Sequence, residues 1–128
     1  MSDAPRLYAI LARSSETAVV FRRGPTKQVQ LWRWHRRRDE FERGQWLAGR
    51  VYERRCDLSP DGTLLVYFAA KYKGPYSTYT VISRPPYFTA LALFPKDDTW
   101  GGGGLFAGPR RLSLNHRAPE QMQLADGF

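Results

Sequence analysis

The chain has 128 residues, of which 42% are hydrophobic and 14% aromatic, and it carries 20 Lys and Arg against 12 Asp and Glu. This length fits a single domain with one core, and the composition excludes a globally disordered chain. The net charge of +8 indicates attraction to an anionic partner, such as nucleic acid, an acidic protein surface or anionic lipid, without selecting among these.

The N-terminal stretch "MSDAPRLYAILARSSE" has only a short apolar patch and no cationic leader before it, so we expect no signal peptide. No stretch approaches the roughly 20 apolar residues that cross a bilayer, so we expect no transmembrane segment. Cys56 is the single cysteine, which excludes an intrachain disulfide and a cysteine-only zinc site and fits a reducing compartment. The expected location is the cytoplasm.

Short β-rich runs separated by glycine, proline and aspartate predict a mainly β chain. "TAVVFRR" (17–23) and "QVQLWRWH" (28–35), joined by "GPTK", predict a hairpin. In its second strand the side chains alternate, so that one face holds Val29, Leu31, Arg33 and His35 and the other holds Gln30, Trp32, Trp34 and Arg36. Neither face is purely apolar, so this pattern leaves open which face meets the core.

Two further runs follow the hairpin. "RVYERRC" (50–56) alternates as a strand does, and "TLLVYFAA" (63–70) is continuously apolar. A continuous apolar run is typical of a strand that is buried on both faces, so 63–70 is predicted to be the central strand.

The C-terminal half begins with "TYTVIS" (78–83) and "YFTALALFP" (87–95), which predict strands separated by a bend or edge at Arg84-Pro85-Pro86. The letters "TALALF" also allow one or two helical turns. Glycines 101–104 predict a loop, after which "LFAGPRRLSLN" can add one more strand.

Together these runs predict one antiparallel meander over residues 1–114, built as a sandwich, an open barrel or a twisted sheet. One short helix is allowed for, at residues 5–12 or 39–48. Residues 115–128 offer few apolar anchors, and we expect a flexible C-terminal tail there.

The stretch "CDLSPDGTLLVYFA" (56–69) contains Ser59-Pro60-Asp61-Gly62, whose residues suit a tight turn. It resembles the turn that leads into an inner strand of a β-propeller blade of the tryptophan-aspartate repeat type. "VQLWRWHRRRDEF" (29–41) resembles a blade's outer strand and turn, with His35 where the repeat prefers aspartate. The resemblance covers roughly 40 residues and implies a local meander, since a closed propeller needs at least four such blades. A propeller-like arrangement would therefore be a fragment or an assembly of chains.

The stretch "QLWRWHRRRDEF" (30–41) interleaves tryptophan with arginine and lies within the most basic part of the chain, between Arg22 and Arg55. Arginine binds phosphate through two parallel hydrogen bonds, and tryptophan stacks on bases. The predicted nucleic-acid-binding residues are Arg22, Arg23, Lys27, Arg33, Trp34, Arg36, Arg37 and Arg38. Alternatively, Trp32 and Trp34 both point into the core, while the arginines solvate the turn and the neighbouring acidic residues neutralise several of them.

Other chemistry has less support in the sequence. A nucleophile pair of Cys56 and His35, oriented by Asp57, is the remote enzymatic alternative. No metal-ligand spacing links the two histidines, and adjacent Asp97 and Asp98 fit an exposed turn better than a cation site, so we expect no metal and no cofactor. The leading hypothesis is therefore a small, basic, non-enzymatic module that binds nucleic acid or another polyanion.

The C-terminal half is rich in Tyr, Phe and Trp. Either these rings form a large, aromatic-rich core, or a core of this size uses only about half of them and the others are exposed. Exposed aromatic residues are favoured at protein interfaces. The alternative function is thus a protein-protein interaction or oligomerisation subunit, with a second copy of the chain as one partner.

Overall fold

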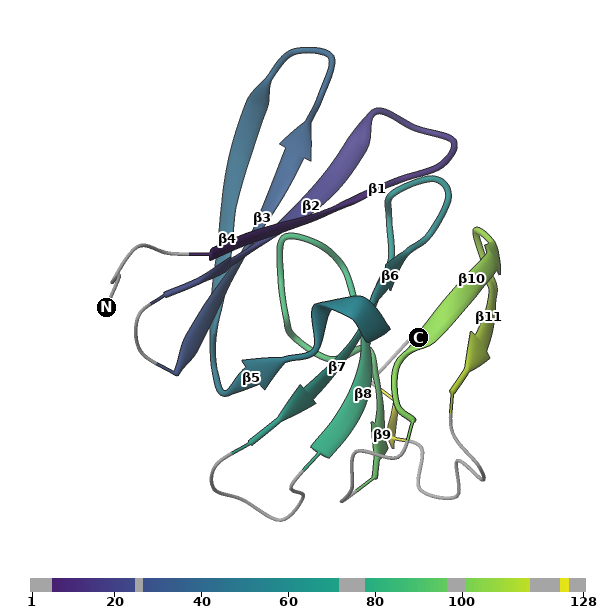
Figure 1. The fold of residues 1–128 in the computed structure, drawn as a ribbon. Coiled ribbons are helices and arrows are strands. Elements are labelled where there is room, and N and C mark those ends of the chain that lie inside the picture. The colour runs from purple at the N-terminus through teal and green to yellow at the C-terminus, as the bar shows by residue number, and fades with distance from the viewer. Residues whose placement is uncertain (1–5, 25–26, 72–77, 97–100, 116–122, 125–128) are drawn as a thin grey trace.

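The computed structural model describes residues 6–24, 27–71, 78–96, 101–115 and 123–124. Antiparallel strands dominate these residues, which confirms the prediction of a mainly β meander (Figure 1). The first sheet contains, in order, β1 (Arg6–Leu11), β2 (Thr17–Arg23), β3 (Gln28–His35) and β4 (Glu40–Ala48). No helix in the described ranges is long and apolar enough to cross a membrane.

The second sheet has the strand order β12, β9, β8, β7, β5, and β6 also pairs with β7. Its strands are β5 (Arg50–Val51), β6 (Asp57–Leu58), β7 (Leu65–Ala70), β8 (Thr78–Ser83), β9 (Ala92–Pro95) and β12 (Gln123–Leu124). The short 3-10 helix η1 (Glu53–Arg55) lies between β5 and β6, and β10 (Gly104–Gly108) with β11 (Arg111–Leu114) forms a separate hairpin. Strand β7 is buried almost throughout, as predicted for the central strand.

The core lies between the first sheet and the second. Val19, Phe21, Val29 and Leu31 from β2 and β3 belong to the same buried cluster as Leu65, Tyr67 and Val81 from β7 and β8. The Tyr67 hydroxyl donates a hydrogen bond of 2.6 Å to the backbone oxygen of Phe88, which satisfies the one polar atom of that buried ring. The hairpin face that holds Val29 and Leu31 is therefore the one that meets the core.

The opposite face of β7 and β8 is covered by the segment that leads into the β10–β11 hairpin. The backbone N–H of Gly103 donates to Thr80 Oγ1 at 2.9 Å, and that of Phe106 donates to Asp57 Oδ2 at 2.8 Å. The second sheet is therefore packed on both faces, with the first sheet on one side and the hairpin on the other (Figure 1). The outer face of the β1–β4 sheet has no described element packed on it.

The predicted turn at residues 59–62 forms ahead of β7. Asp61 accepts hydrogen bonds from Ser59 Oγ at 2.7 Å and from the Thr63 hydroxyl at 2.8 Å, and Gly62 adopts a φ of 78°. The bond from Ser59 is the largest cause of a lowered pKa of the Asp61 carboxyl. The residue types at 59–62 were thus sufficient to predict this turn.

The short helix allowed for at 5–12 or 39–48 forms at neither place, because these stretches contain strands β1 and β4. Each of these strands lies at an edge of the first sheet and gains ladder hydrogen bonds from a neighbour, which overrides local propensity. The strand predicted at 50–56 ends at Val51, and the one at 87–95 begins only at Ala92, so "TALALF" forms no helix. Asp97, Asp98 and His116 lie outside the described residues.

Candidate nucleic-acid interface

The candidate interface is the outer face of the β1–β4 sheet, meaning the face turned away from β7 and β8. Antiparallel partners point their side chains to the same side, so the register defines this face as three rows across four strands. From β1 to β4, the rows are Leu7, Arg22, Gln30 and Trp46; then Ala9, Val20, Trp32 and Arg43; then Leu11, Ala18, Trp34 and Phe41. Three of the chain's four tryptophans are on this face.

Polar contacts and stacking hold the aromatic rings in place. The Trp34 and Phe41 rings stack with centroids 5.5 Å apart and planes 4° apart, and Trp34 Nε1 donates to Asp39 Oδ1 at 3.1 Å. Trp32 Nε1 donates to Gln30 Oε1 at 3.1 Å, while the guanidinium of Arg43 lies 5.4 Å from the Trp32 centroid. These contacts reduce the entropy that the rings would lose on binding a ligand.

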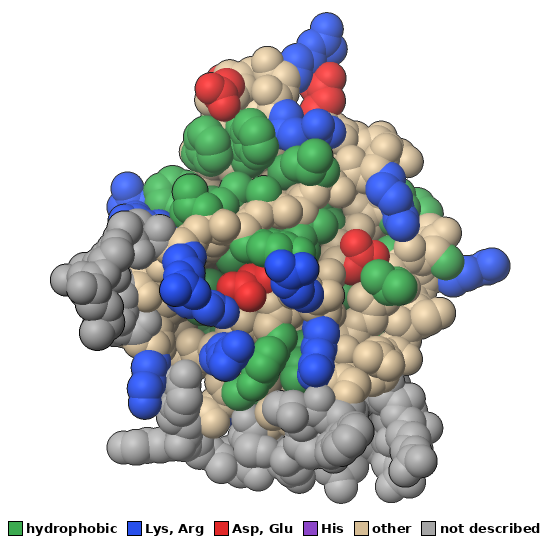
Figure 2. Space-filling view, in the orientation of Figure 1, with side chains coloured by type: hydrophobic (Ala, Val, Ile, Leu, Met, Phe, Trp, Pro, Cys, Tyr) green, Lys and Arg blue, Asp and Glu red, His purple; other side chains and the backbone are tan. Residues whose placement is uncertain are grey.

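The outer face holds most of the large hydrophobic side chains that are exposed in the described residues. Among the described residues, six large hydrophobic side chains are exposed, and four of them lie here: Leu7 at 70%, Leu11 at 50%, Phe41 at 54% and Trp46 at 51%. Hydrophobic side chains gather over this sheet in the upper half of Figure 2. Several exposed hydrophobic side chains on one face mark an interaction surface more often than single exposed residues do.

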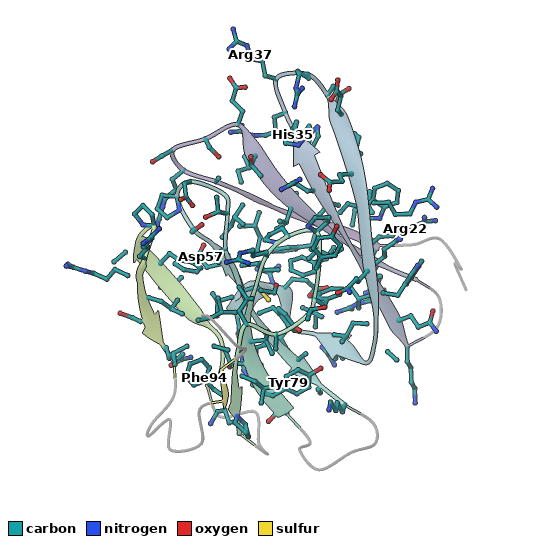
Figure 3. The ribbon with its side chains drawn as sticks, turned by 180° about the vertical axis from the view of Figure 1, so that it is seen from behind. Arg22, His35, Arg37, Asp57, Tyr79 and Phe94 are labelled. Carbon is teal, nitrogen blue, oxygen red and sulfur yellow. The ribbon has the colours of Figure 1, made fainter. Side chains whose placement is uncertain are left out.

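Arg22 and Arg43 supply positive charge to the same face. Both are exposed, and the three rows contain no Asp or Glu. Figure 3 shows Arg22 pointing away from the second sheet. The face therefore combines stacking rings with two cations.

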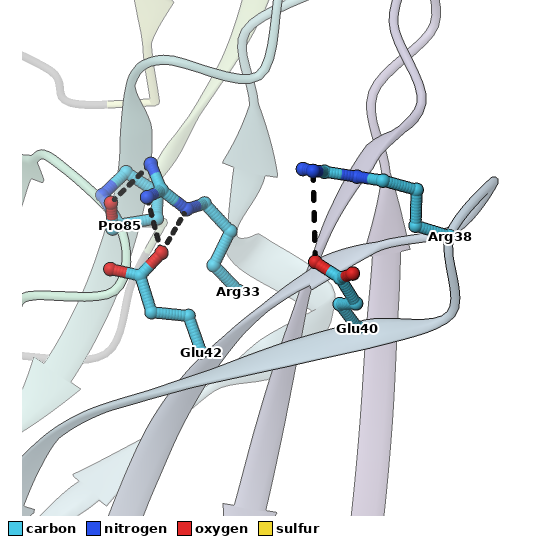
Figure 4. A network of polar contacts seen from close by, with 5 residues as sticks. All are labelled: Arg33, Arg38, Glu40, Glu42 and Pro85. Atoms are coloured by element: carbon cyan, nitrogen blue, oxygen red, sulfur yellow. Dashed lines mark hydrogen bonds and ion pairs between the residues drawn. The ribbon is translucent and has the colours of Figure 1, made fainter.

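Arg33 lies on the opposite, inner side of the same sheet. Its guanidinium forms an ion pair with Glu42 and donates to the backbone oxygen of Pro85 at 3.5 Å (Figure 4). The residue is adjacent to Trp34 in sequence, but strand alternation turns the two side chains in opposite directions.

Arg36, Arg37 and Arg38 occupy the turn at the tip of β3 and β4. Arg36 Nη2 donates to the Ser15 backbone oxygen at 3.0 Å. Arg37 forms an ion pair of 3.7 Å with Glu16. Arg38 forms one of the same length with Glu40, which Figure 4 shows. These exposed pairs stabilise little, but they leave the tip close to electrically neutral.

Arg23 faces inward and pairs with Glu53 at 3.0 Å, and Lys27 is exposed just before β3. Of the eight residues predicted for the site, the structure thus brings Arg22 and Trp34 together on the outer face and places the other six elsewhere. Sequence reasoning missed Phe41, Arg43 and Trp46, because β4 was one of the stretches considered as a short helix.

Two other features of the molecule bear on chemistry. A hollow of about 1350 Å³ runs beside Pro85 and Pro86 and is also lined by the first sheet, the turn at 61–64 and the β10–β11 hairpin; no His or Cys is among its described lining residues. Cys56 is buried in the core, where loss of hydration raises the pKa of its thiol to about 12. No group of three or more His, Cys, Asp or Glu side chains in the described ranges is arranged to hold a metal ion.

A scan against models of protein families found no match to this chain, and searches among curated proteins and among solved structures found none either. The geometry of the outer face is therefore the main indication of function.

Proposed function

We propose that the chain is a binding module for single-stranded nucleic acid, which it contacts through the outer face of the β1–β4 sheet. One observation carries this proposal: four aromatic rings and two arginines lie on the same face of the sheet, and the three rows of that face contain no Asp or Glu. The rings are those of Trp32, Trp34, Phe41 and Trp46. The rings stack on unpaired bases, and Arg22 and Arg43 contact phosphates.

A single strand fits this surface better than a duplex does. Bases in a duplex are stacked on one another, so side-chain rings gain access only to bases that are splayed out. The outer face is a sheet surface on which contacts already hold the rings of Trp32, Trp34 and Phe41, and within the described ranges no helix lies on it that would enter a groove. Because the face has only two arginines, we expect stacking of the rings on bases to contribute more to the affinity than phosphate contacts do.

The test is fluorescence anisotropy with a labelled single-stranded oligothymidylate. Trp46→Ala removes an exposed ring and is expected to weaken binding by about fivefold or more. The matched control is Leu105→Ala, which truncates an exposed apolar side chain on β10; its affinity should equal that of the wild type. Equal losses in both variants, or no binding by the wild type, would refute the proposal.

A salt series tests the cationic part of the face. Arg22→Gln combined with Arg43→Gln removes two phosphate contacts, and the slope of log affinity against log salt is expected to fall by about 1.4. Arg37→Gln combined with Arg38→Gln removes the same charge from the tip and should leave the slope nearly unchanged. Light scattering on the free protein completes the test, because a dimer that buries Trp46 and fails to bind the oligonucleotide would favour a second copy as the partner.

A further inference from the structure

A separate hollow of about 490 Å³ lies where the first strand of the sheet faces β5 and η1. Five arginines line it: Arg6, Arg23, Arg50, Arg54 and Arg55. Blue side chains gather at this place in the lower half of Figure 2. None of the five belongs to the outer face, and four of the five lie outside the predicted hairpin site.

Three elements bring these cations together. Arg6 and Arg23 are cross-strand partners in β1 and β2, so both side chains lie on the inner side of the first sheet. Arg50 comes from β5, and Arg54 and Arg55 from η1. Residues distant in sequence therefore converge on one concave surface.

The carboxylate in the lining, that of Glu53, is already engaged. Arg23 Nη2 lies 3.0 Å from Glu53 Oε1 and also donates to the Val51 backbone oxygen at 3.4 Å. Within the described part of the chain, the guanidinium groups of Arg6, Arg50 and Arg54 form no hydrogen bond or ion pair. Several like charges thus face the same hollow with one acidic side chain to balance them.

Tyr52 orders two of the guanidinium groups. The guanidinium carbon of Arg50 lies 4.6 Å from the Tyr52 ring centroid and that of Arg55 lies 5.5 Å from it. Arg55 Nη1 also donates to the Gly101 backbone oxygen at 2.6 Å. Cations held in this way bind an anion with a smaller loss of side-chain entropy than freely rotating ones.

We propose that this arginine hollow is a binding site for a phosphate group. Converging guanidinium groups match an oxyanion of two or more negative charges, because each can donate two parallel hydrogen bonds to phosphate oxygens. The phosphate comes either from a small phosphorylated molecule or from the phosphorylated end of a nucleic acid strand. The site stands independently of the function proposed for the outer face.

Isothermal titration calorimetry with inorganic pyrophosphate tests the site. Arg50→Gln combined with Arg54→Gln removes two exposed cations from the hollow and is expected to weaken binding by about tenfold or more. Arg37→Gln combined with Arg38→Gln is the control with equal charge loss, and its affinity should stay within about twofold of the wild type. Thermal denaturation of each variant verifies that the fold is retained.

Absence of saturable pyrophosphate binding by the wild type, or an equal loss in both double variants, would overturn the proposal. A second arm distinguishes the sources of phosphate by comparing an oligonucleotide with and without a 5′-phosphate. Tighter binding of the phosphorylated strand identifies a strand end as the ligand, whereas equal binding of both strands beside tight pyrophosphate binding identifies a small molecule. Trp46→Ala should retain pyrophosphate affinity, so failure of this site and failure of the outer face give different results.

Discussion

Cys56 shows how burial determines the chemistry of a single side chain. Its thiol is enclosed in the core and donates to the Tyr52 backbone oxygen, with 3.3 Å between sulfur and oxygen. Loss of hydration is the main cause that raises its pKa from 9.0 to about 12. Because the thiolate is the nucleophilic form, this cysteine is a poor nucleophile at neutral pH.

The raised pKa predicts that the folded state loses stability in alkali. Well below pH 9.0 the thiol is protonated in both states, and its contribution to the free energy of unfolding is fully present. As the pH rises toward 12, the unfolded chain releases the proton first, so that contribution is lost. Urea unfolding across this range should therefore show a smaller alkaline loss for Cys56→Ala than for the wild type. Superimposable profiles of the two proteins would contradict the predicted burial of the thiol.

At the scale of one element, a bulge in β4 positions part of the outer face. The register shifts between Gln30 and Trp32, so that Gly44 and Gln45 together lie opposite Leu31. Gln45 accepts hydrogen bonds at its side-chain oxygen from the N–H groups of Phe88 at 2.7 Å and Thr89 at 3.0 Å. The extra residue returns Trp46 to the face that already holds Trp32 and Trp34.

The bulge requires glycine at position 44. A Cβ atom there would lie 1.8 Å from the Pro86 backbone oxygen and 2.5 Å from that of Leu31. Gly44→Ala should lower the free energy of unfolding in urea by about 1–3 kcal/mol. Gly24→Ala is the control, because the nearest described atom to its Cβ would be the Gln28 backbone oxygen at 3.8 Å, and its effect should stay small. Equal stability of the two variants would contradict this close packing.

The strands that sequence reasoning located best are short β-rich runs that turn residues bound on at least one side. Residues 17–23, 28–35 and 78–83 form strands with the predicted bounds. The bulge at Gly44 breaks the alternation of β4, which explains why 39–48 was not recognised as a strand. Similarly, 50–56 alternates as a strand would, yet hydrogen bonds from Arg55 N to Tyr52 O and from Cys56 N to Glu53 O turn it into η1.

At the scale of the whole molecule, the positive charge is divided rather than concentrated in one hairpin. Arg22 and Arg43 lie on the outer face, five arginines line the hollow near η1, and Arg37 and Arg38 at the β3–β4 tip pair with carboxylates. The net charge of +8 and its excess between Arg22 and Arg55 were visible in the sequence. The division of this charge among three places was not visible in the sequence, because it depends on which strands pair and on where β5 and η1 pack.

The orientation of the tryptophans also required the tertiary structure. Alternation placed Trp32 and Trp34 on one face, but both faces of β3 mix apolar and polar residues. Val29 and Leu31 pack against the second sheet, and this packing determines which face of β3 meets the core. The tryptophans therefore point away from the core. Long-range packing of this kind leaves no periodic signal in a single sequence.

The central claim is that the ordered rings of the outer face stack on unpaired bases. Tryptophan fluorescence of a Trp100→Phe variant tests it most directly, because the remaining tryptophans, Trp32, Trp34 and Trp46, all belong to this face. Titration with a single-stranded oligothymidylate should quench the emission to a saturating level, and added salt should reverse the quenching. Emission that stays constant while anisotropy shows the oligonucleotide bound would contradict the account, because the strand would then lie elsewhere on the molecule.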